Sequence, residues 1–189
     1  MPQIRFLFLL LLAFLLGGCA TTLTPEIRSH VNPDADFSRY RSFAFFSPLG
    51  TDKDGYGSIL SRHLRDATRR ALEARGYRYT ETEPDLLVNF SADAVDKADV
   101  VSFSSMGHYG YRGHWHGLWH GHDTTMLQYQ EGSLNLDLID ARQKQLVWEG
   151  IAEGRITEHA RQNLEATVQS IVEGIFRQYP YQAQGTEAR

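Results

Sequence analysis

Cysteine is almost absent from this chain: Cys19 is the only one in 189 residues. No disulfide can therefore form within one molecule, and the folded part has to be stabilised by packing alone. Basic residues are also few, with 19 Lys and Arg against 23 Asp and Glu, which gives a formal net charge of −4 at pH 7. This balance argues against the clustered basic face that a nucleic-acid partner requires.

Catalytic motifs are missing as well. The sequence has no Gly-x-Ser-x-Gly turn, no His-Glu-x-x-His pair and no glycine-rich loop that would cradle phosphate at the start of a helix. Four carboxylates lie near one predicted hairpin, in the positions of solvent-facing or turn residues: Asp137, Asp140, Glu149 and Glu153. We therefore expect no enzymatic activity, and a hydrolase with an unrecognised site is the least favoured alternative.

Only one long apolar run occurs, from Phe6 to Leu16. Its 11 residues are too few for a membrane-spanning helix, which needs about 20. The amino terminus and Arg5 precede the run with two positive charges, and small residues follow it. Residues 1–18 thus have the three parts of a secretory signal peptide.

The run ends in Leu16-Gly17-Gly18-Cys19, which resembles the lipobox of bacterial lipoproteins. The two small glycines suit cleavage between Gly18 and Cys19, and the cysteine thiol would carry a diacylglycerol. In such signals the new amino group is usually acylated as well, and three chains would anchor the protein permanently because two already anchor stably. The alternative is an ordinary signal peptide cut near this bond, which would leave a free thiol.

Ala20 follows the cysteine. It differs from Asp, the residue that typically retains lipoproteins in the inner membrane, so the resemblance implies the outer membrane and its periplasmic face. Residues 19–35 are expected to form a tether, within which 27–31 can pair as an edge strand. A single periplasmic domain is expected over 36–180, and a flexible tail over 181–189.

Periodic apolar patterns predict the elements of this domain. Steps of three and four residues predict amphipathic helices over 58–75 and 160–179. Alternating leucines predict a strand over 132–140, which a turn at 141–144 joins to an antiparallel partner over 146–152. Further strands are expected over 37–46, 86–92 and 100–103, with a turn at Asp96-Lys97 between the last two.

Two amphipathic helices each need an apolar surface, and a sheet with one apolar face supplies it. The expected fold class is therefore α+β: a two-layer sandwich in which a mainly antiparallel β-sheet carries both amphipathic helices on one face.

Six stretches follow one another along the chain: the lipobox, 36–44, 71–77, 85–88, 132–140 and Leu146-Val147-Trp148-Glu149-Gly150. In this order they resemble domain-of-unknown-function family 4136, a group of bacterial envelope lipoproteins. The resemblance covers the chain from about Asp34 to Tyr179 and implies an α+β fold and an envelope location. It implies no reaction and offers no catalytic residues, because the family is named for lacking an assigned function.

Residues 107–125 break the pattern and are expected to form a loop rich in glycine, histidine and aromatic residues. The pairs His114-x-His116 and His120-x-His122 would each point two imidazoles to one side of an extended chain, offering four ligands to Zn²⁺, Cu²⁺ or Ni²⁺. Carboxylates that would orient the rings are scarce in the segment, and ordering so glycine-rich a loop is costly. The alternatives are a loop without a native ligand, or aromatic contacts with glycan or lipid headgroups.

The sequence therefore predicts an outer-membrane lipoprotein whose domain binds or scaffolds an envelope protein or glycan, without a cofactor and without catalysis. The alternative is a periplasmic metal-binding lipoprotein that uses His114, His116, His120 and His122. The partner specified most directly is the lipid bilayer, reached through acylated Cys19, and no nucleic-acid partner is expected.

Overall fold

The computed structural model describes residues 24–53, 56–104 and 122–183, and at 100–104 and 122–125 it describes the backbone alone. The expected signal peptide, its cleavage site at Gly18-Cys19 and the lipidation site Cys19 lie outside the described residues. The same is true of His114, His116 and His120.

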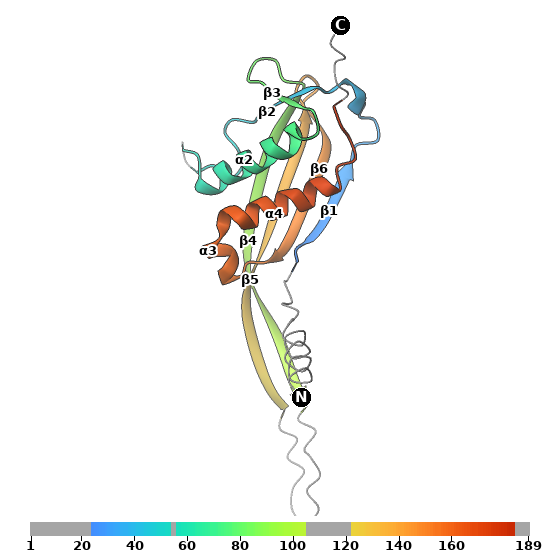
Figure 1. Cartoon of the computed structure of the whole chain (residues 1–189). Coiled ribbons are helices and arrows are strands. Elements are labelled where there is room, and N and C mark those ends of the chain that lie inside the picture. The colour runs from blue at the N-terminus through green and yellow to red at the C-terminus, as the bar shows by residue number, and fades with distance from the viewer. Residues whose placement is uncertain (1–23, 54–55, 105–121, 184–189) are drawn as a thin grey trace, which may run out of the picture.

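A six-stranded sheet forms one layer of the domain (Figure 1). The strand order across the sheet is β1-β6-β5-β4-β2-β3. The pairs β1–β6, β6–β5 and β5–β4 are antiparallel, whereas β2 lies parallel to both β4 and β3, so the sheet is mainly antiparallel as predicted. The strands are β1 (Glu26–Val31), β2 (Ser42–Phe45), β3 (Arg78–Tyr79), β4 (Leu86–Ser104), β5 (His122–Asp140) and β6 (Gln145–Arg155).

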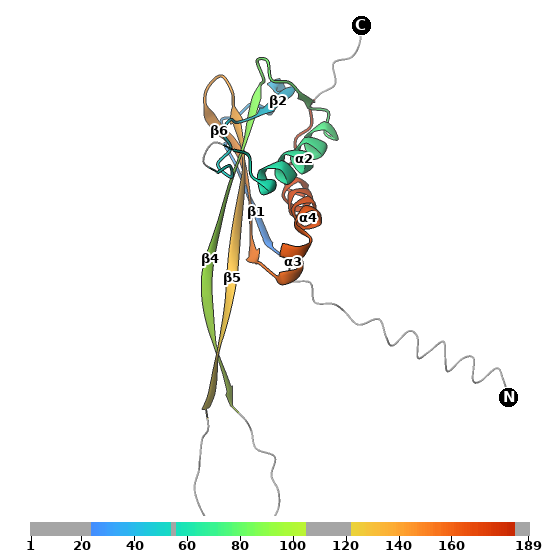
Figure 2. The ribbon, with the colours of Figure 1, turned by 90° about the vertical axis from the view of Figure 1, so that its left-hand side faces the viewer.

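The helices α2 (Ile59–Glu73) and α4 (Leu164–Arg177) form the second layer, with the short α3 (Glu158–Gln162) before α4. Figure 2 shows all three on one side of the sheet, which confirms the two-layer α+β sandwich. The predicted helix over 160–179 is divided in two, because Asn163 has φ −121° and ψ 49° and interrupts the helical backbone.

Capping explains the bounds of α2. The Ser58 hydroxyl accepts a hydrogen bond from Ser61 N at 2.9 Å, which satisfies one of the free amides of the first turn. At the other end Gly76 adopts φ +86°, and Tyr77 N donates back to the Leu72 carbonyl at 3.1 Å. A side chain at Gly76 would be strained, so the turn requires glycine there.

The core lies between the sheet and the helices. Leu134, Leu136 and Leu138 all point into it, as their alternation predicts. The largest buried side chain is Trp148, and the neighbouring inward position on β6 is Gly150. A Cβ at Gly150 would lie 2.6 Å from the Trp148 ring, so the glycine makes room for the indole. Trp148 and Gly150, which are part of the family resemblance, are thus required together for packing.

The predicted strand over 37–46 is wrong in its first half. Residues Phe37–Arg39 form a 3₁₀ turn (η1), which begins where the Asp36 carboxylate accepts a hydrogen bond from Ser38 N at 3.0 Å. Phe37 and Tyr40, one turn apart, are both buried. The aromatic residues therefore enter the core from a turn, and only 42–45 join the sheet.

Both ends of the domain extend further than expected. The stretch predicted as a tether contributes β1, which pairs with β6 along its length and so takes the edge position that the sequence allowed for. At the other end Tyr181 stacks on Phe37 with ring centroids 3.7 Å apart, and Ala183 N donates to the Arg75 carbonyl at 3.0 Å. The expectation of a flexible tail is therefore wrong for residues 181–183.

Strands β4 and β5 continue far beyond the rest of the sheet (Figures 1 and 2). Strand β6 ends at Arg155, opposite Glu131, so in the nine residue pairs from Asp96–Gln130 to Ser104–His122 the strands β4 and β5 have no further strand neighbour among the described residues. We call residues 96–104 and 122–130 the arm. The predicted turn at Asp96-Lys97 is wrong, and so is the end of the predicted loop, because residues 122–125 belong to β5.

Candidate interaction surface

The arm is held in line with the sheet at its root. Arg155 Nη2 donates to the Asp99 carboxylate at 2.6 Å, and its guanidinium lies 3.8 Å from the centroid of the Tyr129 ring. The Tyr129 hydroxyl donates to the other oxygen of Asp99 at 3.3 Å, and Lys97 pairs with Glu131. Each of these exposed contacts is worth at most about 1 kcal/mol, but together they fix the direction in which the arm leaves the domain.

The helix layer holds the same root from the other face of the sheet. Arg161 Nη2, on α3, donates to the Gln130 side chain at 2.6 Å, and Ile156 N donates to the Gln130 backbone carbonyl at 2.8 Å. The short helix α3 therefore sits against the point where β6 leaves the sheet and the arm begins.

Beyond its root the arm exposes apolar side chains and unpaired backbone. Met126 is 67% exposed and Leu127 is 50% exposed, and because they are neighbours on β5 they point to opposite faces of the arm. Both outer edges of the two strands lack a strand partner among the described residues. An isolated two-stranded ribbon is only marginally stable in water, so the arm is the part of the domain best suited to binding something else.

A row of polar side chains crosses the sheet on the face away from the helices. His30, Glu149, Asp137 and Asn89 lie opposite one another on four neighbouring strands. Burial, followed by the charge of Glu149, raises the pKa of Asp137 to about 6. The row contains two carboxylates and one imidazole, but no three His, Cys, Asp or Glu side chains of the described residues come together as metal ligands.

From the raised pKa of Asp137 we predict how the free energy of unfolding of the domain depends on pH. Because the folded state holds this proton more tightly than the unfolded chain does, the free energy of unfolding falls as pH rises from about 4 to above 6. Asp137→Asn should therefore stabilise the domain at pH 7.5, by about 1 kcal/mol after allowance for solvent screening of a half-buried group. The gain should shrink at pH 4.5. Urea unfolding at both pH values measures it.

A matched control for this prediction is Asp93→Asn, which removes the same charge from an exposed position on the same face of the sheet. It should change stability little at either pH. An equal gain for Asp137→Asn at pH 4.5 and pH 7.5 would contradict the prediction, because the effect would then not depend on ionisation.

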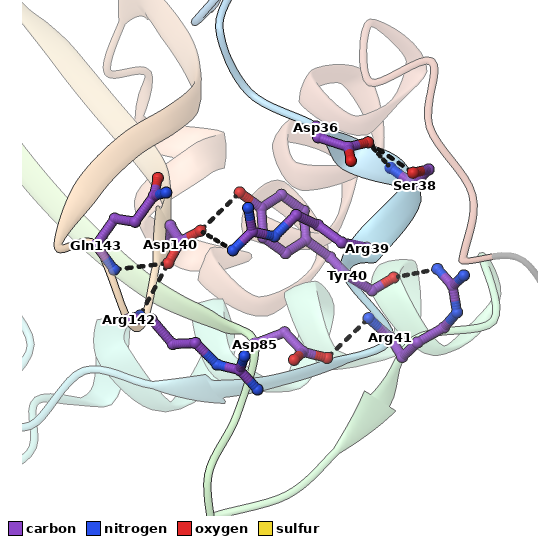
Figure 3. A network of polar contacts seen from close by, with 9 residues as sticks. All are labelled: Asp36, Ser38, Arg39, Tyr40, Arg41, Asp85, Asp140, Arg142 and Gln143. Carbon is purple, nitrogen blue, oxygen red and sulfur yellow. Dashed lines mark hydrogen bonds and ion pairs between the residues drawn. The ribbon is translucent and has the colours of Figure 1, made fainter.

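A second polar network lies at the end of the sheet opposite the arm (Figure 3). Asp140 is buried and accepts hydrogen bonds from Tyr40 Oη at 3.0 Å and from Arg142 N and Gln143 N at 2.8 Å each, with Arg39 Nη2 3.7 Å away. Burial alone would raise the pKa of Asp140, but these hydrogen bonds and the Arg39 charge lower it overall. Burial and the bond to Asp140 raise the pKa of Tyr40 to about 12.

This network is structural. It ties η1 to the turn between β5 and β6, and the nearby Asp85 carboxylate fixes the start of β2 by accepting from Arg41 N at 2.9 Å and from Ser42 N at 3.0 Å. The sequence correctly places Asp140 at a turn, but its burial depends on Tyr40, which is 100 residues away in the chain.

An open hollow of about 790 Å³ lies at the start of α2. Its lining includes the basic side chains of Lys53, Arg62 and Arg65 and no His or Cys. The Ser61 hydroxyl in its wall lies 2.7 Å from Thr51 Oγ1 and 3.0 Å from Ser58 Oγ. The Asp52 carboxylate also lines the hollow, and the Ser61 hydroxyl lowers the pKa of this carboxyl by bonding to it. Because a lowered pKa makes Asp52 a weak base and the lining has no imidazole, the hollow has the chemistry of a surface depression rather than of a hydrolase site.

The candidate metal ligands of the sequence are only partly placed. His122 lies in β5 opposite Ser104, so the two strands that flank residues 105–121 are paired up to that segment. The arm itself, which is the main feature of the surface, was missed by the sequence reasoning. Among the described helices, none is long and apolar enough to cross a membrane.

The family model for a domain of unknown function (DUF4136) matches residues 27–181. The matched range begins in β1 and ends at Tyr181, which stacks on Phe37, so it coincides with the folded domain. No curated protein matches the chain.

Two solved structures share the fold. A DUF4136 family protein from Bacteroides thetaiotaomicron VPI-5482 superposes with a TM-score of 0.52 at 13% identity, covering 85% of this chain and 98% of that one. A PDZ domain protein from Parabacteroides distasonis ATCC 8503 gives a TM-score of 0.55 at 15% identity over 88% of this chain, which spans 39% of that protein's length. At these identities the likeness shows the fold alone.

Proposed function

We propose that this chain, which belongs to the DUF4136 family, is an outer-membrane lipoprotein whose domain binds or scaffolds an envelope component without catalysis. The observation that carries the proposal is the place of the only cysteine. Cys19 ends an apolar run of signal-peptide length and stands seven residues before β1, at the edge of the folded domain. Lipidation at that position would attach the domain to the bilayer through a linker of only six residues, 20–25.

The periplasmic face is the proposed location because Ala20 is not the aspartate that retains lipoproteins in the inner membrane. The proposed partner is an envelope protein or a glycan. Residues 105–121, which join the two strands of the arm, contain Tyr109, Tyr111, Trp115 and Trp119 in the sequence. Aromatic rings suit contacts with sugars and with protein surfaces alike.

A non-catalytic role is supported by what the described residues offer. Among the described residues the buried titratable side chains are bonded to one another, Tyr40 to Asp140 and Tyr77 to Tyr179, and Asp140 also accepts from backbone amides. Asp137, whose pKa is raised, lies on an open face of the sheet rather than in a cleft. Binding through a surface therefore fits these residues better than chemistry in a pocket does.

Replacing the cysteine tests the anchor directly. Cys19→Ala should accumulate as the unprocessed precursor and should lose all labelling by radioactive palmitate, because the residue that carries the lipid is gone. Gel mobility and acyl labelling of cells that express the full chain measure both effects. Normal processing and labelling of this variant would refute the lipobox assignment.

A matched control separates anchoring from sorting. Ala20→Asp should keep acyl labelling, because the cysteine is unchanged, but should move the protein to the inner-membrane fraction of a density gradient. If Ala20→Asp stays in the outer-membrane fraction, the proposed sorting signal is wrong although lipidation stands.

A further inference from the structure

We propose that the arm rests on the headgroup layer of the membrane that carries the anchor, with the domain lying along the bilayer. The inference rests on the proposed acylation of Cys19. It assigns a lipid surface as the partner of the apolar side chains that the arm exposes, chiefly Met126 and Leu127.

The chain enters the sheet at the end from which the arm leaves it. Glu26, the first residue of β1, lies opposite Glu153, two residues from the end of β6 at Arg155. A Cβ added to Gly154 would lie 3.2 Å from Pro25, so the chain still follows the sheet one residue before β1 begins. The start of β1 and the root of the arm are therefore at the same end of the sheet (Figure 1).

The short linker limits where the bilayer can lie. Seven residues from Cys19 to Glu26 span at most about 25 Å. From the row of Glu26 the sheet and the arm continue to the Ser104–His122 pair, which is 11 residues along β4 from Asp93, or about 37 Å at 3.4 Å per residue. An arm that pointed straight at the bilayer would therefore pass about 12 Å beyond its surface.

The opposite orientation does not fit either. The body of the sheet runs from Ser133 to Asp140 on the other side of that row, which is about 24 Å, and the turn at 141–144 lies beyond it. A domain standing with its arm away from the membrane would need more linker than the chain provides. The tether thus holds the long axis of the domain at an oblique angle or parallel to the bilayer.

The composition of β4 suits an interface. Its charged residues in the arm, Asp96, Lys97 and Asp99, are all near the root, whereas residues 100–104 of the sequence are apolar or carry hydroxyl groups. The exposed Met126 and Leu127 lie opposite this transition, paired with Val100 and Asp99. On β5 the arm has a single carboxylate, Asp123, opposite Phe103, so β4 becomes less charged away from the domain and the far end of the arm carries one acidic residue.

The unpaired outer edges of the arm limit how deeply it can enter the membrane. Unpaired backbone N–H and C=O groups cannot enter hydrocarbon, because nothing there satisfies them. The headgroup layer retains water and phosphate oxygens, so it can accept both the edges and the apolar side chains. Charged residues along an edge also discourage pairing with a strand of another molecule, which makes Asp96, Lys97 and Asp99 a barrier to dimerisation through the root.

Two matched leucines test the inference. Leu127 lies in the arm and Leu146 at the opposite end of the sheet, and their exposed fractions are 50% and 45%. Leu127→Cys and Leu146→Cys, each in the full lipidated chain, would be labelled with an environment-sensitive maleimide fluorophore and reconstituted in phosphatidylethanolamine–phosphatidylglycerol vesicles. Brominated acyl chains quench fluorophores at the membrane, and aqueous iodide quenches those in water.

The expected result is loss of fluorescence by brominated lipid at position 127 and by iodide at position 146. Because the contact is apolar, lipid quenching at 127 should persist at high salt. Quenching by iodide at both positions, or by lipid at both, would overturn the inference. Protection of position 127 from both quenchers would overturn it too, since a protein or a second copy would then cover the arm.

The same experiment distinguishes failure of the anchor from failure of the inference. The unsubstituted chain has one cysteine, and acylation would block its thiol, so it should take up no maleimide fluorophore. Labelling of the unsubstituted chain would show that Cys19 is free and would refute the proposed function. An unlabelled, vesicle-bound chain without lipid quenching at position 127 would refute only the placement of the arm.

Discussion

Trp148→Ala is expected to lower the free energy of unfolding by about 3–5 kcal/mol, the cost of deleting a large aromatic side chain from a packed core. The indole is fully buried, lies 5.9 Å from the Phe176 ring and 5.0 Å from the Tyr179 ring between centroids, and fills the space left by Gly150. Its Nε1 has no hydrogen-bond partner, so the loss would come from packing alone. Urea unfolding followed by circular dichroism measures it.

The control for this prediction is two residues away on the same strand. Leu146→Ala removes an exposed side chain and should change stability by no more than about 0.5 kcal/mol. Trp148→Phe, which keeps a ring against Phe176, should fall between the two. A loss below about 1 kcal/mol for Trp148→Ala would mean that the core does not depend on the contact between β6 and α4.

Asp140→Ala is expected to cost about 3 kcal/mol, because it leaves the buried Tyr40 hydroxyl and two backbone amides without their acceptor. Since the pKa of Asp140 is lowered in the folded state, its contribution is present above the usual pKa of an aspartate and is lost as pH falls through the lowered value. The difference between the two chains should therefore hold from pH 8 to pH 5 and narrow below about pH 4.

Tyr40→Phe provides the partner for a double-mutant cycle. It removes one hydrogen bond and leaves Asp140 bonded to the turn amides, so it should cost only about 1 kcal/mol. The double variant should cost less than the sum, because the two residues share a contact. Strict additivity would indicate that the Tyr40–Asp140 hydrogen bond contributes nothing.

The parts of the fold that follow from local pattern were predictable. The helix at 58–75 and the hairpin of 132–140 with 146–152 have apolar residues at the spacing of one face, and each is closed by residues next to it in the chain. Ser58 and Gly76 set the two ends of this helix through local contacts and backbone conformation. Periodicity and caps therefore carried enough information to give the fold class and both layers.

The arm was not predictable by the same means. A half-buried strand alternates apolar and polar residues, but Asp96 and Lys97 are both exposed although they point to opposite faces of the arm, so they are as suitable there as in a turn. The partners that make it a ribbon, residues 122–130, follow a long segment, and nothing local to Asp96 indicates them. A turn was predicted at Asp96-Lys97 because the alternation of apolar residues ends there, although the pairing of β4 with β5 continues.

The 3₁₀ turn at Phe37–Arg39 shows a different limit. Its aromatic residues suit a strand by composition, yet Asp36 caps a turn and places Phe37 and Tyr40 on one side of it. This arrangement is stabilised by Tyr181, far along the chain, whose ring stacks on Phe37. Tertiary packing overrides local preference here, as it does for the tail that supplies Tyr181.

The pairing of β1 has a consequence for the proposed export of the chain. Its strand neighbour in the described sheet is β6, and the two are far apart in sequence, as the Arg28–Glu153 ion pair with its separation of 125 residues shows. In a chain threaded across a membrane from its N-terminus, β1 would cross first and would find no partner until most of the polypeptide had followed. Long-range pairing of this kind forms slowly, so the topology would itself help to keep the precursor open enough to be translocated.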